Sequence, residues 1–214
     1  MAKLRITYNA PVVLTFAVVA LIVTFLPLET RVHYFAAHPK LYDWTSYLGL
    51  FSHILGHGGW DHYIGNFMLI LLLGPILEER HGSLSLFIMM MITALVTGLA
   101  NVALSSNPLL GASGIVFMMI LLASTANIKQ GEIPLTFIAI ALIYLGGEIY
   151  RAFASDDNVS RMAHLIGGLA GAVFGFIGAR GKGIESKPVK DLGLPTAKAS
   201  EVQKLKPKPK IPAA

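Results

Sequence analysis

Six stretches of the chain are almost entirely apolar, and polar or turn-forming residues separate them. A helix needs about 20 apolar residues to cross a hydrocarbon layer about 30 Å thick. Most of the stretches approach that length, so the pattern predicts an all-α, polytopic membrane protein. The expected spans are residues 10–28, 62–76, 84–104, 111–126, 133–150 and 161–179.

The segment between the first two stretches, residues 29–61, resembles neither a span nor an ordinary polar loop. Tryptophan, tyrosine and aliphatic residues are interleaved there with histidine and glycine, as around Trp44, Tyr47 and Trp60. Aromatic rings that carry a polar group favour the boundary between membrane and water. We therefore expect this segment to lie partly in the outer interface.

The fourth stretch starts abruptly at Gly111, directly after the turn-forming residues 105–108. This pattern predicts a helix whose N-terminus lies below the membrane surface. Irregular backbone at that depth is tolerated only where protein or a water-filled cavity surrounds it. The start of the fourth span is therefore expected to face such a cavity.

Composition and charge agree with a membrane location. Of the 214 residues, 54% are hydrophobic and 14% are charged, whereas about a quarter of the residues of a soluble domain are charged. With six spans both termini lie on one side, and thirteen of the 17 lysines and arginines fall on that side. Because cytoplasmic loops are enriched in basic residues, both termini are expected in the cytoplasm.

The net charge of +5 depends on the C-terminal end, where eight lysines lie among proline, alanine and serine. Such a composition buries too little apolar surface to fold. We expect a six-helix domain over residues 1–180 and a disordered, basic cytoplasmic tail over residues 181–214. The tail is interpreted as a solvated determinant of topology, with contact to anionic lipid headgroups as the alternative. Nucleic acid is not an expected partner.

The start of the fourth span, Gly111-Ala112-Ser113-Gly114, suits a serine nucleophile. Small neighbours leave room for a substrate backbone, and a helix N-terminus supplies free N–H groups that stabilise an oxyanion. Taken alone, the same pattern is more often a site of tight helix packing.

His164 lies a few residues inside the sixth span and is the only histidine in the last three spans. An ionisable group in a membrane usually faces an interior cavity with a function, and a neutral imidazole could act as the base for Ser113. A structural hydrogen bond is the alternative. Gly167 and Gly171 form a G-x-x-x-G pair that could bring this helix close to Ser113.

His62 and Asn66 are four residues apart in the second span and share one helical face. Both can donate hydrogen bonds to an oxyanion, although capping by His62 and interhelical bonding by Asn66 are alternatives. No acidic residue lies near the middle of a span, so a Ser-His dyad is the simplest catalytic hypothesis.

Together these residues resemble the rhomboid family of intramembrane serine proteases. The resemblance covers about residues 10–180. It rests on Gly111-Ala112-Ser113-Gly114, on His62 with Asn66, on the run Ala163 to Gly171, and on Gly74, Glu78 and Gly82. The Trp-Arg pair of the family's first loop has no counterpart at Trp44, which Thr45 follows.

The resemblance implies a rhomboid-like bundle of six transmembrane helices in the bacterial inner membrane. Its substrates would be single-pass transmembrane proteins, cleaved within the bilayer through an acyl-enzyme, with no metal or other cofactor. Ser113 would be the nucleophile and His164 the general base. The oxyanion and substrate site would comprise His62, Asn66, Gly111 and Ala112. Phe117 would pack against His164, and Glu78, Gly167 and Gly171 would be structural.

Three alternatives from other classes stay open at this stage. A catalytically silent relative could use the same fold to bind membrane helices, although such relatives lose the serine or the histidine. His53, His57 and His62 could bind a metal or haem, but Gly58 and Gly59 interrupt the helix between them. A transporter is disfavoured because no convincing internal repeat is evident.

Overall fold

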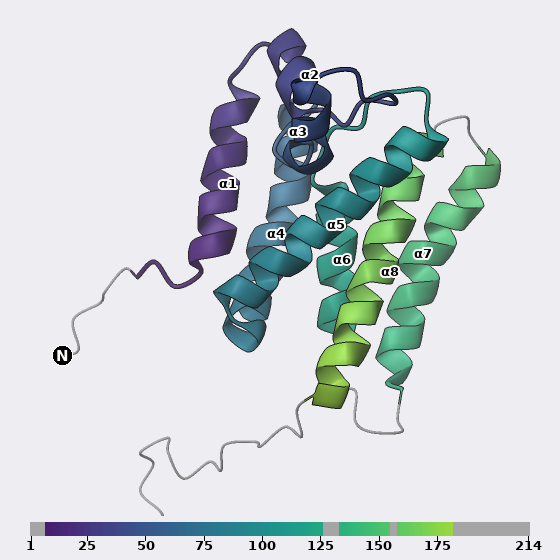
Figure 1. The fold of residues 1–214 in the computed structure, drawn as a ribbon. Helices are drawn as coiled ribbons and strands as arrows, with labels where there is room; N and C mark the ends of the chain where they lie inside the picture. Colours follow the sequence, from purple (N-terminus) through teal and green to yellow (C-terminus); the bar gives the residue numbers. More distant parts are fainter. Residues whose placement is uncertain (1–6, 126–132, 155–157, 182–214) are drawn as a thin grey trace, which may run out of the picture. The chain divides into compact units, whose positions relative to one another are not determined.

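The computed structural model describes residues 7–125, 133–154 and 158–181 (Figure 1). Within these ranges the chain is helical, apart from loops and an isolated bridge between Ala37 and Leu109, so the all-helical prediction is confirmed. The helices are α1 (Pro11–Thr24), α2 (Leu28–Phe35), α3 (Trp44–Ser52), α4 (Trp60–His81), α5 (Ser83–Leu104), α6 (Ser113–Ser124), α7 (Leu135–Ala154) and α8 (Asn158–Gly181). The predicted tail, residues 181–214, lies outside the described residues except for Gly181, which ends α8.

Two of the described helices, α4 and α5, are long and apolar enough to cross a membrane by length and composition, with 22 residues each. The apolar helices α1 and α6 are shorter, with 14 and 12 residues. A helix of 12 residues is about 18 Å long, well short of a hydrocarbon layer. That the chain crosses the membrane six times therefore stays a prediction.

Two helix boundaries differ from the prediction. The first span was expected to reach residue 28, but α1 ends at Thr24 and α2 starts at Leu28. Pro27 disfavours helical backbone at the residue before it. The second span was expected to end at residue 76, but α4 continues through Pro75 to His81. Membrane helices tolerate an internal proline when neighbouring groups satisfy the freed backbone.

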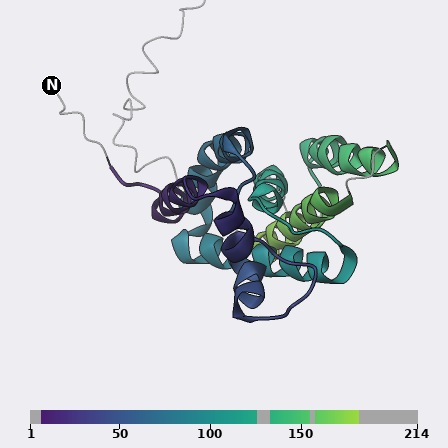
Figure 2. The same ribbon diagram turned by 90° about the horizontal axis from the view of Figure 1, so that it is seen from above.

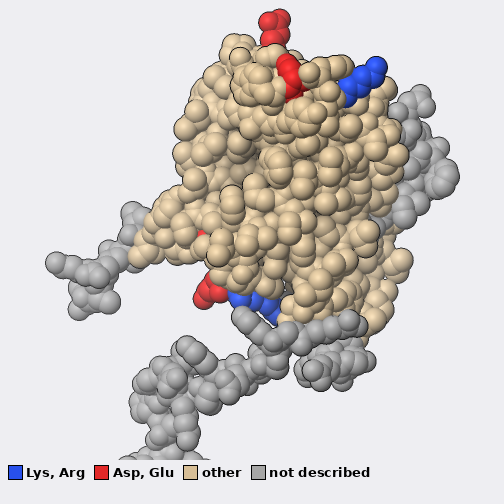
Figure 3. All heavy atoms as spheres, in the orientation of Figure 1, with Lys and Arg blue, Asp and Glu red and all other residues tan. Residues whose placement is uncertain are grey.

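The predicted interfacial segment, residues 29–61, contains most of α2 and all of α3. Several of its apolar side chains are exposed, including those of Trp44, Tyr47 and Phe51. Figure 1 shows α2 above the end of α1, with α3 below α2, beside the upper part of α1. In Figure 3 the charged side chains on this face gather at its two ends, with a broad band of other residues between them.

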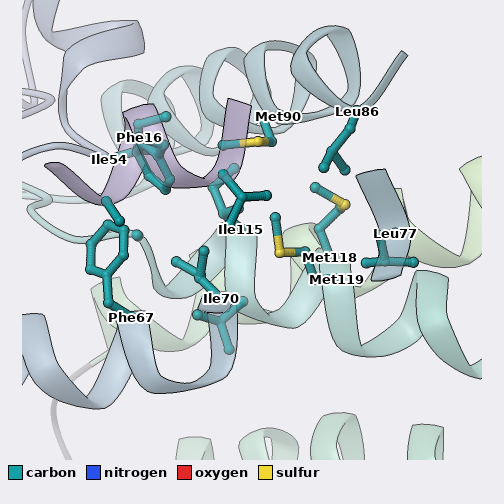
Figure 4. Packing of buried hydrophobic residues seen from close by; sticks show 14 of the residues in the cluster. Phe16, Ile54, Phe67, Ile70, Leu77, Leu86, Met90, Ile115, Met118 and Met119 are labelled. Atoms are coloured by element: carbon teal, nitrogen blue, oxygen red, sulfur yellow. The ribbon is translucent and has the colours of Figure 1, made fainter. Parts of the chain in front are cut away.

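Helix α6 forms the centre of the helical domain. Eight of its 12 residues are buried, and it contacts α4, α5, α7 and α8. Seen from above, α6 lies among these four helices (Figure 2). A helix that is apolar all round must be surrounded by other elements. In Figure 4, Ile115, Met118 and Met119 of α6 meet side chains from α1, α4 and α5.

Helices α6 and α8 are in direct backbone contact at two glycines. A Cβ atom added at Gly167 would lie 2.0 Å from the Gly114 carbonyl oxygen, and one at Gly171 would lie 2.1 Å from that of Met118. Because no side chain fits at either position, the two backbones can approach closely. The close approach expected from the G-x-x-x-G pair is present, and it joins the serine helix to the histidine helix.

We expect Gly171→Ala to lower the melting temperature of the protein in detergent. The added methyl group would overlap a backbone atom of α6 and force the helices apart, at a cost of about 1–3 kcal/mol. Gly178→Ala on the same helix is the matched control, because a Cβ there meets nothing within 4 Å. Alanine is the better helix former, so the control should not lose stability. Equal melting temperatures for the two variants would contradict the assigned contact.

Glu78 fastens the start of α1 to the end of α4. Its buried carboxylate accepts hydrogen bonds from the backbone N–H groups of Val12 and Val13, each at 3.0 Å, and from the Ser83 hydroxyl at 2.7 Å. The first N–H groups of a helix have no partners within the helix, and α1 has no side-chain cap of its own. Glu78 therefore caps α1 from another helix.

Candidate active site

Ser113 is the first residue of α6 and is half-buried. Gly111 precedes it with φ of +128°, a value that L side chains rarely adopt. The Gly111 N–H donates to the His53 carbonyl oxygen at 3.0 Å. This hydrogen bond fixes the turn before α6. The first N–H groups of the helix, which have no partners within it, therefore lie at Ser113. The helix was expected to start at residue 111 and starts two residues later.

His164 lies on α8 beside the first turn of α6. Its ring stacks on the ring of Phe117, with the centroids 4.4 Å apart and the planes 5° apart. Phe117 is one turn after Ser113, so both project from the same side of α6. A Cβ at Gly114 would lie 3.3 Å from the Ala163 carbonyl oxygen. The residues adjoining Ser113 and His164 are thus in contact, which brings the two side chains to one site.

His62 and Asn66, on α4, form the opposite wall of this site. A Cβ at Gly111 would lie 2.7 Å from His62 Cε1 and 3.8 Å from Asn66 Nδ2, so both side chains approach the turn before Ser113. His62 is also close enough to His164 for their charges to interact. The structure therefore brings together all four polar residues that the sequence singled out: Ser113, His164, His62 and Asn66.

Asn66 carries an unused hydrogen-bond donor. Its side chain is only 7% exposed, and Nδ2 has no hydrogen-bond partner among the described residues. Buried polar groups in native proteins are nearly always bonded. A buried amide nitrogen that faces Gly111 and the start of α6 is thus suited to donate to an oxygen atom of a bound molecule.

A cavity of about 230 Å³ lies beside Ala163, between the C-terminal part of α5 and the N-terminal part of α8. Polar side chains from α5 and from the loop before α6 line part of it, among them Thr97, Asn101 and Asn107. A polar cavity of this size has room for several water molecules. The cavity lining reaches Ala163, the residue before His164 in the sequence.

His53 and His57 support the site from the loop between α3 and α4. His53 Nε2 lies 3.1 Å from the Ala94 carbonyl oxygen and 3.3 Å from the Thr97 hydroxyl. The His57 ring packs edge-on against the ring of His62 at 5.2 Å. Within residues 7–125, 133–154 and 158–181, no three His, Asp or Glu side chains are grouped to hold a metal ion.

Burial of both loop histidines is expected to make the stability of the protein sensitive to acid. Burial lowers the pKa of His53 to about 4, and burial followed by the charges of His62 and Arg31 lowers that of His57 to about 4. In the unfolded chain both groups protonate near pH 6.5. Between pH about 6.5 and 4 the unfolded state therefore binds more protons, so stability is full above this window and falls with decreasing pH.

We expect the melting temperature in detergent to fall steadily from pH 7 to pH 4.5. Each histidine contributes up to about 3 kcal/mol to the loss. In His57→Phe the titrating group is gone while an aromatic ring still faces His62, so the slope of melting temperature against pH should be smaller. A slope equal to that of the wild type would contradict the low pKa of His57.

Two groups of polar residues around the site were not predicted. Thr93, Thr97 and Asn101 are buried and follow one another at four-residue spacing on α5. Asn101 donates to the carbonyl oxygens of Ala37 and Asn107. Their spacing within an apolar span is the signal that could have identified them. The second group is Arg31 of α2, whose guanidinium donates to the His57 carbonyl oxygen.

Comparison with known proteins places these residues in context. The model of the Rhomboid domain matches residues 44–181, which is more than half of the chain. Rhomboid-related protein 1 of Caenorhabditis elegans is 32% identical over 154 residues, covering 65% of this chain and 41% of the relative. Rhomboid-related protein 2 of Mus musculus is 30% identical over 139 residues, covering 58% and 46%. The chain thus matches less than half the length of either relative.

Proposed function

The chain belongs to the rhomboid family of membrane proteins, and from this premise we propose that it is an intramembrane serine endopeptidase with a Ser113–His164 dyad. The observation that carries the proposal is the convergence of three helix segments on one site. These are the N-terminus of α6 at Ser113, the His164 ring stacked on Phe117, and the buried Nδ2 of Asn66 on α4, which has no hydrogen-bond partner among the described residues. Each supplies a part that acyl transfer requires.

In the proposed first step, His164 accepts the hydroxyl proton of Ser113 as Oγ attacks the carbonyl carbon of the scissile bond. The resulting oxyanion receives hydrogen bonds from the backbone N–H of Ser113, from Asn66 Nδ2 and from His62. The C–N bond then breaks, and the protonated His164 returns its proton to the leaving amine. The amine product departs, leaving an ester on Ser113.

Water completes the reaction. A water molecule from the polar cavity beside Ala163 transfers a proton to His164 and attacks the ester carbon, and the same groups stabilise the second oxyanion. His164 then protonates Ser113 Oγ as the acyl group leaves as a carboxylic acid. His164 thus acts as base and acid in both halves, without an acidic third residue.

The proposed substrates are single-pass transmembrane proteins. In this proposal the six apolar helices α1 and α4 to α8 form the membrane segments, and both termini lie in the cytoplasm because most basic residues are on that side. Ser113 then lies below the outer surface of a bacterial inner membrane. A substrate helix must unwind to expose its backbone there, so small or helix-breaking residues near its outer end favour cleavage.

The proposal is tested by labelling with a fluorophosphonate, which phosphonylates an activated serine. Purified wild type in detergent should be labelled, whereas Ser113→Ala should not. Labelling that persists in Ser113→Ala would refute the assignment of the nucleophile. A folded wild type that neither reacts nor cleaves a transmembrane reporter would favour the alternative function, the binding of membrane helices without cleavage.

A further inference from the structure

Arg31 is a buried cation on a helix outside the catalytic bundle. It lies in the middle of α2 and is 9% exposed. Its Nη1 donates to the His57 carbonyl oxygen, and its Nε is buried with no hydrogen-bond partner among the described residues. A buried charge is costly unless it is paired and hydrogen-bonded. Burying the Arg31 charge therefore does not stabilise the fold by itself, and its position calls for a functional explanation.

The carbonyl that Arg31 holds belongs to the loop of residues 53–59, which we call the histidine loop. This loop contacts both parts of the proposed oxyanion site. At its start, the His53 carbonyl oxygen accepts the Gly111 N–H. Near its end, the His57 ring packs against the rings of His62 and Phe67, at 5.2 and 5.6 Å. A shift of the histidine loop would thus move Gly111 and His62 relative to Ser113.

The fixed end of this connection is α2 itself. A Cβ at Gly56 would lie 2.5 Å from the Phe35 carbonyl oxygen, so the histidine loop lies directly on the end of α2. The Ser52 hydroxyl donates to the Tyr34 carbonyl oxygen at 2.8 Å. Two hydrogen bonds therefore connect α2 to this region. The bond from Arg31 reaches the histidine loop at His57, whereas the bond from Ser52 reaches α2 from the end of α3.

We propose that Arg31 is a positioning residue for catalysis, which sets the place of His62 and Gly111 by holding the histidine loop at the His57 carbonyl. This inference rests on the proposed function, because it concerns the same oxyanion site. Guanidinium is suited to the task since its rigid, planar group holds a hydrogen bond in a fixed direction. Charge-assisted bonds are also about twice as strong as neutral ones. Arg31 itself touches no reacting atom.

Three variants of the full-length protein in detergent test this role: Arg31→Gln, Arg31→Lys and Ser52→Ala. The measurements are the rate constant of fluorophosphonate labelling, kcat and KM for a fluorogenic transmembrane reporter, and hydrogen exchange over residues 53–59. Arg31→Gln should lower the labelling rate and kcat by about 10- to 100-fold, because small misplacements of catalytic groups have effects of this size. KM should change by less than about threefold, and exchange over residues 53–59 should rise.

The other two variants separate positioning from general docking of α2. Lysine keeps a charged donor without the planar geometry, so Arg31→Lys should recover only part of the lost kcat and stay below Ser52→Ala. Ser52→Ala removes a neutral tie to the same helix and should leave kcat within about twofold of the wild type, since a neutral bond contributes only about 1 kcal/mol. If Arg31→Gln is not recovered folded, a kcat below that of Ser52→Ala in Arg31→Lys supports the inference, and an equal or higher kcat overturns it.

Two results would overturn the inference while leaving the proposed function intact. The first is an Arg31→Gln variant that is labelled at the wild-type rate with unchanged hydrogen exchange. The second is an equal loss of kcat in Arg31→Gln and Ser52→Ala, which would show that any loosening of α2 has this effect. A wild type that fails to react would instead overturn the proposed function, and this inference with it.

Discussion

Replacing Ser113 or His164 by alanine is expected to lower the rate of cleavage by at least about 10⁴-fold, and replacing both should lower it no further. Without the serine there is no atom to form the acyl-enzyme, and without the histidine the serine proton has no acceptor. Because both residues act in the same steps, their effects should not add. Rates are measured on a reporter with one transmembrane segment in liposomes.

Phe117→Leu provides the control for the dyad variants. It removes the ring that stacks on His164 but leaves both reacting groups, so a smaller loss of activity is expected. The melting temperatures of the alanine variants should stay near that of the wild type, because Ser113 and His164 are both half-buried. A double variant much slower than either single variant would show that serine and histidine act independently, contrary to the dyad.

Replacing Asn66 by alanine is the second change with a large expected effect. The loss of one preorganised oxyanion donor lowers kcat by about 10²- to 10³-fold. Stability should not fall, because the amide nitrogen removed is buried and has no partner in the described residues, and such a group is costly to keep buried. The measurements are kcat, KM and the melting temperature in detergent.

Asn101→Ala is the matched control for Asn66→Ala. Asn101 is equally buried, but its amide nitrogen donates to the carbonyl oxygens of Ala37 and Asn107. Its removal should lower the melting temperature, because the two carbonyl groups lose a donor. If Asn66→Ala keeps kcat within about threefold of the wild type, or loses as much stability as Asn101→Ala, Asn66 is not an oxyanion donor.

Much of the candidate site could be predicted because its residues stand out against an apolar background. A histidine or an asparagine within a run of leucine and isoleucine is costly in a membrane, so His164 and Asn66 are conspicuous. Spacing then gives the geometry: four residues place His62 and Asn66 on one helical face, and glycines four residues apart on α8 predict the close approach to α6.

The connections behind the site could not be predicted in the same way. Arg31 lies in a polar segment, where an arginine is ordinarily exposed, and only the three-dimensional path of the chain buries it against His57. The end of α4 was also missed, because the apolar run stops before Glu78, and only the contacts with α1 and Ser83 show why this carboxylate is buried within the helix. Local patterns predicted the helices and the polar residues of the candidate site, whereas the contacts of Arg31 and Glu78 with distant segments required the structure.

The two sides of α6 differ in how much adjustment they permit. Toward α8 the contact is backbone on backbone at Gly167 and Gly171, with no side-chain torsion that could absorb a displacement. Toward α4 and α5 the contact includes the buried side chains of Met90 and Met119, and unbranched thioethers can change rotamer at little cost. We therefore expect strain on α6 to be absorbed by rotamer changes of these methionine side chains, while the backbone contact keeps α6 and α8 together and Ser113 beside His164.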